Sequence, residues 1–172
     1  MSNEWEAIHQ SRHWGTYPAE YMVRLVKQFM AGRSDTPSAL DIGCGAGAHS
    51  WMMEREGMSV SAIDISPTAI ARMPQIAPSA LAFVGDITVA EWSPMSFDFV
   101  LDNLSLTHVE RPPMERILSW LKPGGVFVSA SFLIPPHGAP RSWPHAIGEL
   151  LETHEISRSG HSHKIGVHKW SK

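Results

Sequence analysis

The residues with the clearest chemical pattern in this chain are three glycines that alternate behind an acidic residue. The run Ala39–Gly47 begins as an apolar stretch typical of a buried strand, and its glycines predict a sharp turn into a helix. Glycine is needed where the backbone takes a positive φ or approaches a ligand closely, and a helix start offers unpaired N–H groups to an anion. The run therefore predicts a loop that holds a cofactor, with Asp41 placed to reach an ammonium or hydroxyl above the strand ends.

The spacing of these glycines differs from that of dinucleotide-binding loops, which read G-x-G-x-x-G. Here Gly47 comes one residue earlier, and Asp41 stands two residues before Gly43. At this point the chain resembles the class I S-adenosylmethionine-dependent methyltransferases, whose first motif is an acidic residue, one spacer and G-x-G-x-G. Four further segments resemble the later landmarks of that family in the correct order: Val60–Asp64, Val84–Ile87, Phe97–Asn103 and Leu121–Gly125.

The resemblance implies S-adenosyl-L-methionine as cofactor and S-adenosyl-L-homocysteine as product. It implies that Asp64 binds the ribose diol through charge-assisted hydrogen bonds, that Asp86 meets the adenine amino group, and that Asn103 approaches the methionine portion. The cofactor-binding residues expected in these motifs are Asp41, Gly43, Cys44, Gly45, Gly47, Asp64, Ile65, Asp86, Ile87 and Asn103. The alternatives are that Asp64 and Asp86 are ordinary helix or turn caps, and that Cys44 only fills tight space.

Histidines supply the candidates for acid–base and metal chemistry. His108 shortly follows the fourth predicted strand, and imidazole titrates near neutral pH, so His108 is the candidate catalytic base. The alternative is a histidine bonded to backbone at a helix start. His161, His163 and His168 could suggest a metal cluster, but alternation along an exposed hairpin gives the same pattern, and no nearby cysteine or carboxylate completes a site. We expect no metal.

The segment before the glycine loop combines two aromatic residues with turn residues. In the resembled family this segment often folds over the cofactor, so Trp14 and Tyr17 are candidate lid residues that could cover a sulfonium by cation–π attraction. The alternative is that both rings pack the first helix onto the sheet. We expect 1–33 to form this lid and helix.

The apolar pattern and the breakers predict an α/β chain. The expected fold is a Rossmann-like three-layer sandwich whose mostly parallel seven-stranded sheet carries an antiparallel C-terminal strand. Ser66 and Pro67 predict a helix start, and Pro74 and Pro78 are expected to cut that helix short. The other helices are expected over 16–31, 46–56, 114–121 and 143–153. Strands are expected to end at Asp64 and to cover 81–84, 97–101 and 126–132, with a hairpin over 155–170.

Composition fits a single cytoplasmic domain. The 172 residues are expected to form one unit, with 38–132 as the cofactor-binding core and 141–172 as a C-terminal helix and hairpin. Cys44 is the only cysteine, so no disulfide within the chain is possible. The net charge of −3 and the lack of a basic run argue against nucleic acid as a partner. No membrane-spanning apolar run and no signal pattern appear.

Taken together, the sequence predicts methyl transfer to an oxygen or nitrogen of a small-molecule acceptor. A short-chain dehydrogenase would need Tyr-x-x-x-Lys, and the only tyrosines, Tyr17 and Tyr21, precede the glycine loop. An amino-directed DNA methyltransferase would carry an Asp/Asn-Pro-Pro-aromatic tetrad where this chain has Asp102–Ser105. The alternative is a catalytically idle subunit that binds the cofactor and activates a partner methyltransferase. A homodimer or a partner subunit is possible under either view.

Overall fold

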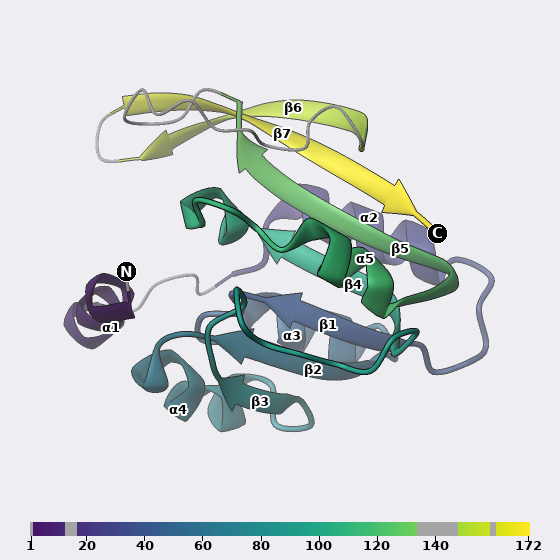
Figure 1. Ribbon diagram of the computed structural model, residues 1–172, viewed down its shortest axis with the longest axis horizontal. Coiled ribbons are helices and arrows are strands. Elements are labelled where there is room, and N and C mark those ends of the chain that lie inside the picture. Colours follow the sequence, from purple (N-terminus) through teal and green to yellow (C-terminus); the bar gives the residue numbers. More distant parts are fainter. Residues whose placement is uncertain (1, 13–16, 134–147, 159–160) are drawn as a thin grey trace.

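A single mixed β-sheet organises the molecule. The computed structural model describes residues 2–12, 17–133, 148–158 and 161–172. Within them seven strands lie in the order β3-β2-β1-β4-β5-β7-β6 (Figure 1). Their bounds are β1 Ser38–Ile42, β2 Ser59–Asp64, β3 Leu81–Val84, β4 Phe97–Asn103, β5 Leu121–Phe132, β6 Glu149–Arg158 and β7 His161–Ser171.

The pairing of the strands confirms the expected fold class. β1 to β5 pair in parallel, whereas β7 runs antiparallel to both β5 and β6. The strand order reverses between β1 and β4, whose carboxyl ends therefore flank the crevice where such sheets bind ligands. This crevice positions the site described below.

Helices cover both faces of the sheet (Figure 1). The helices of the described residues are α1 Ser2–Ser11, α2 Glu20–Met30, α3 Ala48–Arg55, α4 Pro67–Ile76 and α5 Met114–Trp120, with a short 3₁₀ helix at Leu106–His108. α1 packs on α4 and not on the sheet. On one face α2 and α3 bury Met22, Val26 and Met53 against the sheet. On the other face Ile117 and Trp120 of α5 pack on β1, β4 and β5. Burial on both faces explains why the central strands are nearly continuous apolar runs.

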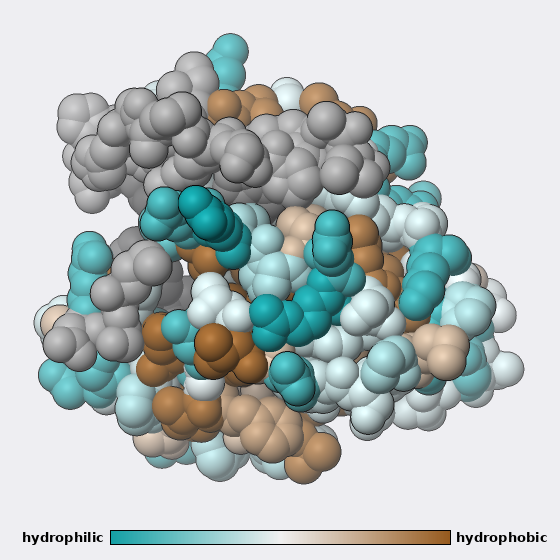
Figure 2. All heavy atoms as spheres, viewed as in Figure 1, coloured by the Kyte–Doolittle hydropathy of each residue, from teal (hydrophilic) through white to brown (hydrophobic). Residues whose placement is uncertain are grey.

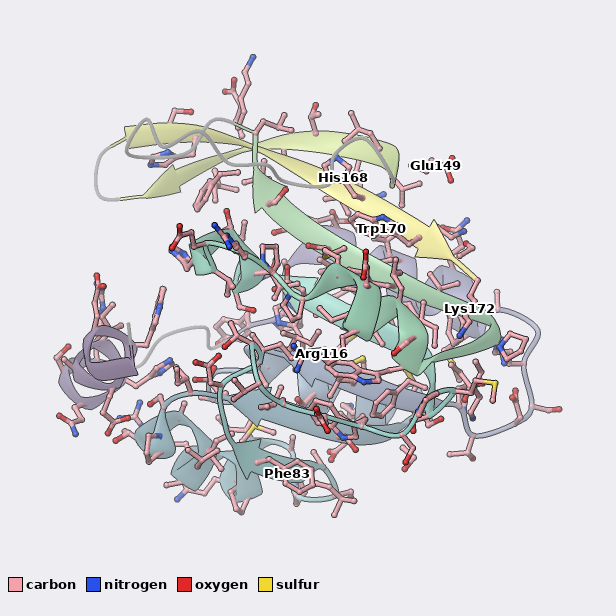
Figure 3. All side chains as sticks on the ribbon, in the orientation of Figure 1. Phe83, Arg116, Glu149, His168, Trp170 and Lys172 are labelled. Atoms are coloured by element: carbon pink, nitrogen blue, oxygen red, sulfur yellow. The ribbon has the colours of Figure 1, made fainter. Side chains whose placement is uncertain are left out.

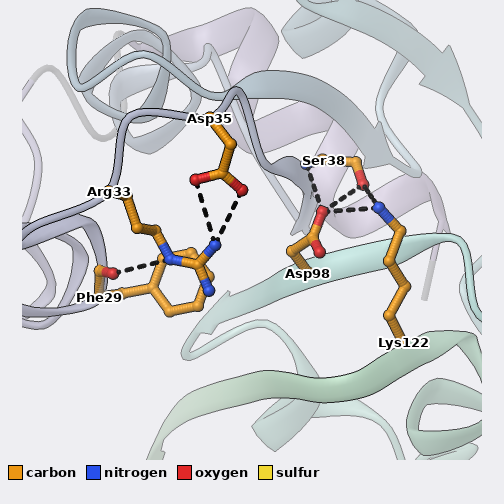
Figure 4. A network of polar contacts seen from close by, with 6 residues as sticks. All are labelled: Phe29, Arg33, Asp35, Ser38, Asp98 and Lys122. Carbon is orange, nitrogen blue, oxygen red and sulfur yellow. Dashed lines mark hydrogen bonds and ion pairs between the residues drawn. The ribbon is translucent and has the colours of Figure 1, made fainter.

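The amino end of the central strands is held by a polar network (Figure 4). The Asp98 carboxylate accepts hydrogen bonds from the backbone N–H and the hydroxyl of Ser38, both at 2.8 Å, and pairs with Lys122 Nζ at 2.7 Å. These contacts join β1, β4 and β5 at the end of the sheet opposite the glycine loop, so they fix the register of the strands without taking part in the site.

Two helices differ from their predicted bounds. α2 begins at Glu20 rather than at Thr16, which lies outside the described residues. α4 begins as predicted, with the Ser66 hydroxyl accepting a hydrogen bond from the Ala69 N–H, but it continues through Pro74 to Ile76. The buried side chains of Met73 and Ala77 pack this last turn against Ala62 of β2, which outweighs the backbone hydrogen bond that proline removes.

The C-terminal region corrects the predicted helix over 143–153. Residues 149–153 belong to β6, and residues 143–147 lie outside the described part of the chain. The hairpin expected over 155–170 is therefore longer and begins at Glu149. A short apolar pattern is ambiguous between helix and strand, and here pairing with β7 decides it. β5 also begins earlier than expected, at Leu121, because that residue pairs with Phe97.

Candidate functional site

The glycine loop lies at the carboxyl end of β1 and bends back toward β2. Gly43, Gly45 and Gly47 all have positive φ, at 64°, 54° and 98°. The Gly43 and Cys44 N–H groups both donate to the Ile63 carbonyl, at 2.8 and 3.1 Å. A Cβ at Gly43 would collide with the Ser105 side chain. Glycine is therefore required at position 43 both by conformation and by space.

Asp64 ends β2 and faces this loop. Its carboxylate accepts hydrogen bonds from the Gly45 N–H at 2.8 Å and from the Ser66 N–H at 2.9 Å. The two backbone donors hold the charged group in place at the edge of a cavity. Because a carboxylate has about four lone-pair sites, Asp64 keeps acceptor capacity for a ligand.

The cavity beside Asp64 has a volume of about 210 Å³ and lies at the crevice of the sheet. Residues from the glycine loop, from the ends of β2, β3 and β4, and from α1 line it. Of the residues predicted from sequence, it brings together Gly43, Gly45, Asp64, Ile65, Asp86, Ile87, Asn103 and His108. These residues come from four separate segments between Gly43 and His108, so the predicted convergence on one site is present in the fold.

Asp86 is ordered by the turn that follows β3. Its Oδ1 accepts hydrogen bonds from the Thr88 N–H at 2.8 Å and from the Thr88 hydroxyl at 2.7 Å. Arg116, which points from α5 toward this segment (Figure 3), donates to the carbonyls of Thr88 and Ala90. The turn that carries Asp86 and Ile87 is thus tied to the body of the protein.

β3 itself leaves an apolar surface next to this turn. Leu81, Phe83, Val84 and Val89 are exposed, and Figure 2 shows hydrophobic side chains gathered at the β3 edge of the molecule. Phe83 is labelled in Figure 3 on this edge strand.

The loop after β4 is built around Asp102, which the sequence analysis did not assign a role. Its buried carboxylate accepts hydrogen bonds from the N–H groups of Ser105 and Leu106 and from the hydroxyls of Ser105 and Ser129. Burial raises the pKa of Asp102 above its ordinary value, and the hydrogen bonds, which lower the pKa, offset this effect only in part. The Asp102 carboxylate thereby fixes the turn that leads to His108.

Asn103 and His108 both lie at the cavity. The Asn103 side-chain oxygen accepts a hydrogen bond from the Tyr21 hydroxyl at 2.8 Å, which links it to α2. The His108 ring contacts Trp5 of α1 edge-on, with ring centroids 4.8 Å apart. His108 is therefore placed between the loop after β4 and the N-terminal helix.

Tyr17, Cys44 and Gly47 were predicted at the site but do not line the cavity. Tyr17 is 85% exposed and does not line the cavity, so it does not cover the site; it sits in the extended segment before α2. Cys44 and Gly47 pack against α4 near Met73 and are not part of the cavity lining. Burial raises the pKa of the Cys44 thiol. Trp14 lies outside the described residues.

Sequence reasoning missed the residues that take the place expected for a lid. Trp5 and His9 of α1 line the cavity, one helical turn apart. Glu6 of the same helix accepts hydrogen bonds from the Ser66 hydroxyl at 2.6 Å and from the N–H and hydroxyl of Thr68. Hydrogen bonds from Ser66 and then Thr68 lower the pKa of Glu6 to about 2. The spacing of Trp5 and His9 by four residues was the available signal.

Asp41 is buried behind the cavity rather than in its lining. The Ser50 hydroxyl donates to it at 2.6 Å. Burial raises the pKa of Asp41 to about 7, and the negative charges of Asp64 and Asp102 add to the effect. Ser50 of α3 thus lies against the carboxylate on the side away from the cavity lining, and the direct contact of Asp41 with the cofactor stays a prediction.

The raised pKa of Asp41 predicts a pH-dependent stability. Below its ordinary value of 3.8 the carboxyl is protonated in both the folded and unfolded chain; between about 4 and about 7 only the folded chain holds the proton, so stability falls as pH rises. Asp41→Asn should remove this fall. When the pH is raised from 5 to 8, the parent chain should lose on the order of 2 kcal/mol in free energy of unfolding that the Asp41→Asn variant does not lose. Urea denaturation at both pH values measures it, and parallel profiles for the two chains would contradict it.

The described residues contain no group of three or more potential metal ligands from histidine, cysteine, aspartate and glutamate. His168 instead lies on β7 with its ring 6.0 Å from that of Trp170 (Figure 3). No helix among the described residues is long and apolar enough to cross a membrane.

Comparison with known proteins agrees with this geometry. A family described as a methyltransferase domain matches residues 39–125, about half of the chain. The chain belongs to this family. The matched segment runs from β1 to the start of β5 and contains the glycine loop, Asp64, Asp86 and the loop after β4. The resemblance stated from the motifs is thereby confirmed.

Individual relatives of this methyltransferase-domain chain match it over a similar extent. A ubiquinone biosynthesis O-methyltransferase of Pseudomonas paraeruginosa is 37% identical over 100 residues, which cover 54% of this chain and 43% of the relative. An uncharacterized methyltransferase of Mycobacterium bovis is 31% identical over 104 residues, which cover 58% and 53%. The chain thus spans about half the length of the curated relatives it matches.

Solved structures share the fold across the whole chain. The N-methyltransferase NodS from Bradyrhizobium japonicum, in complex with S-adenosyl-L-homocysteine, has a TM-score of 0.69 at 17% identity, covering 98% of this chain and 97% of NodS. A protein of echinomycin biosynthesis has a TM-score of 0.74 at 18% identity, covering 100% and 91%. At such low identity these likenesses concern the fold alone.

Proposed function

We propose that this protein transfers a methyl group from S-adenosylmethionine to an oxygen or nitrogen of a small-molecule acceptor. One observation carries the proposal: Asp64, held by the Gly45 N–H, faces a cavity that Asp86, Asn103 and His108 also line. The family membership gives this site its chemical context.

The residues at the cavity suit the parts of this cofactor. Asp64 would hold the ribose hydroxyls, since a fixed carboxylate accepts charge-assisted hydrogen bonds from them. Asp86 would meet the adenine amino group while Ile87 packs on the base. Asn103 and the glycine loop would contact the methionine portion. When bound, the cofactor supplies a methyl group on a sulfonium that is already activated.

The work left to the protein is mainly alignment. Holding an acceptor in line with a reactive group and excluding water is worth roughly 7 to 11 kcal/mol of a reaction barrier. α1 covers one side of the cavity through Trp5 and His9. His108, whose ring contacts Trp5, is the residue proposed to take a proton from an acceptor that must lose one.

Small-molecule acceptors are favoured by the relatives. The relatives include O-methyltransferases of ubiquinone biosynthesis, and the structural neighbours include a 1,6-didemethyltoxoflavin N1-methyltransferase of Burkholderia thailandensis bound to 1,6-didemethyltoxoflavin. The names of these two enzymes describe methyl transfer to small molecules, one at oxygen and one at nitrogen. They therefore support an oxygen or nitrogen acceptor for this protein.

Two measurements test the proposal. Calorimetric titration with S-adenosylhomocysteine should give saturable binding, and incubation with methyl-labelled S-adenosylmethionine and a pool of extracted metabolites should move label into a small molecule. Saturable binding without any transfer would favour a cofactor-binding subunit that depends on a partner. An absence of binding to well-folded protein would overturn the proposal.

A further inference from the structure

The N-terminal helix places a histidine inside the cavity that no motif of the sequence analysis identified. His9 is 3% exposed, and its Cε1 lies 3.5 Å from the position that a Cβ at Gly45 would occupy. The imidazole thus rests directly over the glycine loop. The negative charge of Asp64 also acts on the His9 ring.

One nitrogen of the His9 ring has no hydrogen-bond partner within the described part of the chain. Nδ1 of His9 is buried and makes no hydrogen bond to the residues that the structure describes. Buried polar atoms in proteins are nearly always paired, so an unpaired buried nitrogen on a side chain that lines a cavity indicates that a ligand atom pairs with it. Burial, the largest effect, lowers the pKa of His9, which leaves a neutral ring with one N–H and one bare nitrogen.

The polar groups of Asp64 and His9 indicate which ligand group fits between them. Asp64, which lines the same cavity, is an acceptor that binds hydroxyl donors, while a neutral imidazole nitrogen can either donate or accept. A hydroxyl can serve both partners, because it carries one proton and two lone pairs. A ribose diol offers two such groups on adjacent carbons.

We propose that His9 is a further cofactor-binding residue, whose Nδ1 hydrogen bonds a ribose hydroxyl of the nucleoside held by Asp64. This inference rests on the proposed function, since it assigns a residue to the same cofactor. It makes α1 part of the nucleoside site rather than a packing element.

Ser66 connects α1, which carries His9, to the turn that carries Asp64. The Ser66 N–H donates to Asp64, and the Ser66 hydroxyl donates to Glu6 of α1. α1 is therefore anchored to the same turn that orients the Asp64 carboxylate. Because Ser66 contacts both elements, it holds His9 and Asp64 at a fixed separation. Such a fixed separation is needed if the two side chains are to bind one ribose together.

Three substitutions of His9 test the assignment. The side-chain amide nitrogen of asparagine lies close to the position of the imidazole Nδ1, whereas that of glutamine lies one bond further from the backbone. Leucine fills similar space with no polar atom. We expect His9→Leu and His9→Gln to weaken S-adenosylhomocysteine binding about tenfold by calorimetry, and His9→Asn to stay within about threefold of the parent. Glu4→Leu, at an exposed position of the same helix, is the matched control and should bind as the parent does.

A second measurement identifies the ligand group. Adenosine, 2′-deoxyadenosine and 3′-deoxyadenosine are compared as competitors of S-adenosylhomocysteine. The parent chain should prefer adenosine to at least one deoxy form, and His9→Leu should lose most of that preference. An unchanged preference in the variant would overturn the assignment to the ribose.

The outcomes separate this inference from the proposed function. If the parent binds S-adenosylhomocysteine and folded His9→Leu and His9→Gln bind it equally well, His9 is not a cofactor ligand and the proposed function stands. If the parent itself does not bind, the proposed function fails first. Thermal unfolding of each variant checks the fold, and where leucine destabilises it the contrast between asparagine and glutamine decides.

Discussion

Asp64→Asn should weaken binding of S-adenosylhomocysteine by about 100-fold or more. The substitution keeps the shape of the side chain but removes its charge, and the two charge-assisted hydrogen bonds that we propose between Asp64 and the ribose would be worth about 1.5 to 3 kcal/mol each. The new amide also turns an N–H₂ group toward the Gly45 or Ser66 N–H, which now donate to the carboxylate. Calorimetric titration of parent and variant measures the loss.

The control for this experiment is a carboxylate at the other end of the sheet. Asp98→Asn removes the ion pair with Lys122 but lies away from the cavity, so it should lower stability and leave the Kd for S-adenosylhomocysteine unchanged. Equal Kd values for parent and Asp64→Asn would show that Asp64 is only a cap of the glycine loop.

Gly43→Ala should cause the largest loss of stability of any single methyl group added to the loop. The added Cβ would collide with the Ser105 side chain, and φ of 64° disfavours any residue with a Cβ. Strain of about 1 to 2 kcal/mol and overpacking of about 1 to 3 kcal/mol together predict a loss of several kcal/mol. Thermal unfolding should show Tm lowered by roughly 10 °C.

Two further variants separate the steric clash with Ser105 from the backbone strain at positive φ. Gly32→Ala has a similar φ of 76° with no atom within 4 Å, so it should lose only about 1 to 2 kcal/mol. Ser105→Gly removes the atoms that the new methyl meets, but it also removes the hydroxyl that donates to Asp102 and to the Ile42 carbonyl. It should therefore lower Tm less in Gly43→Ala than in the parent chain. An equal loss of Tm in both backgrounds would argue against the contact with Ser105 as the cause.

What could be predicted from sequence was what local chemistry decides. The glycine loop, the strand over 81–84 and the capped start of α4 at Ser66 each follow from neighbouring residues, and the structure has all three. The order of the acidic landmarks also sufficed to predict that Asp64 and Asp86 meet at one cavity, because parallel strands end at a common edge.

What could not be predicted depends on packing between distant segments. The expected lid aromatics were Trp14 and Tyr17, but the described helix at the cavity is α1, which Glu6 anchors to α4 across 60 positions of sequence. Asp41 matched its motif, yet the turn into α3 brings Ser50 over it and hides it. The C-terminal segment carried a helical apolar spacing that strand pairing with β7 overrides.

The position of β7 inside the sheet has a consequence for how the chain is made. β7 lies between β5 and β6 and pairs with β5 from Val126–Ser171 to Phe132–Ile165. The hydrogen-bonding edge of β5 therefore has its full set of partners only when residues 165–171 have been synthesised. On the ribosome, the parallel strands β1 to β5 can assemble early, but the backbone edge of β5 stays unpaired until β7 has been translated.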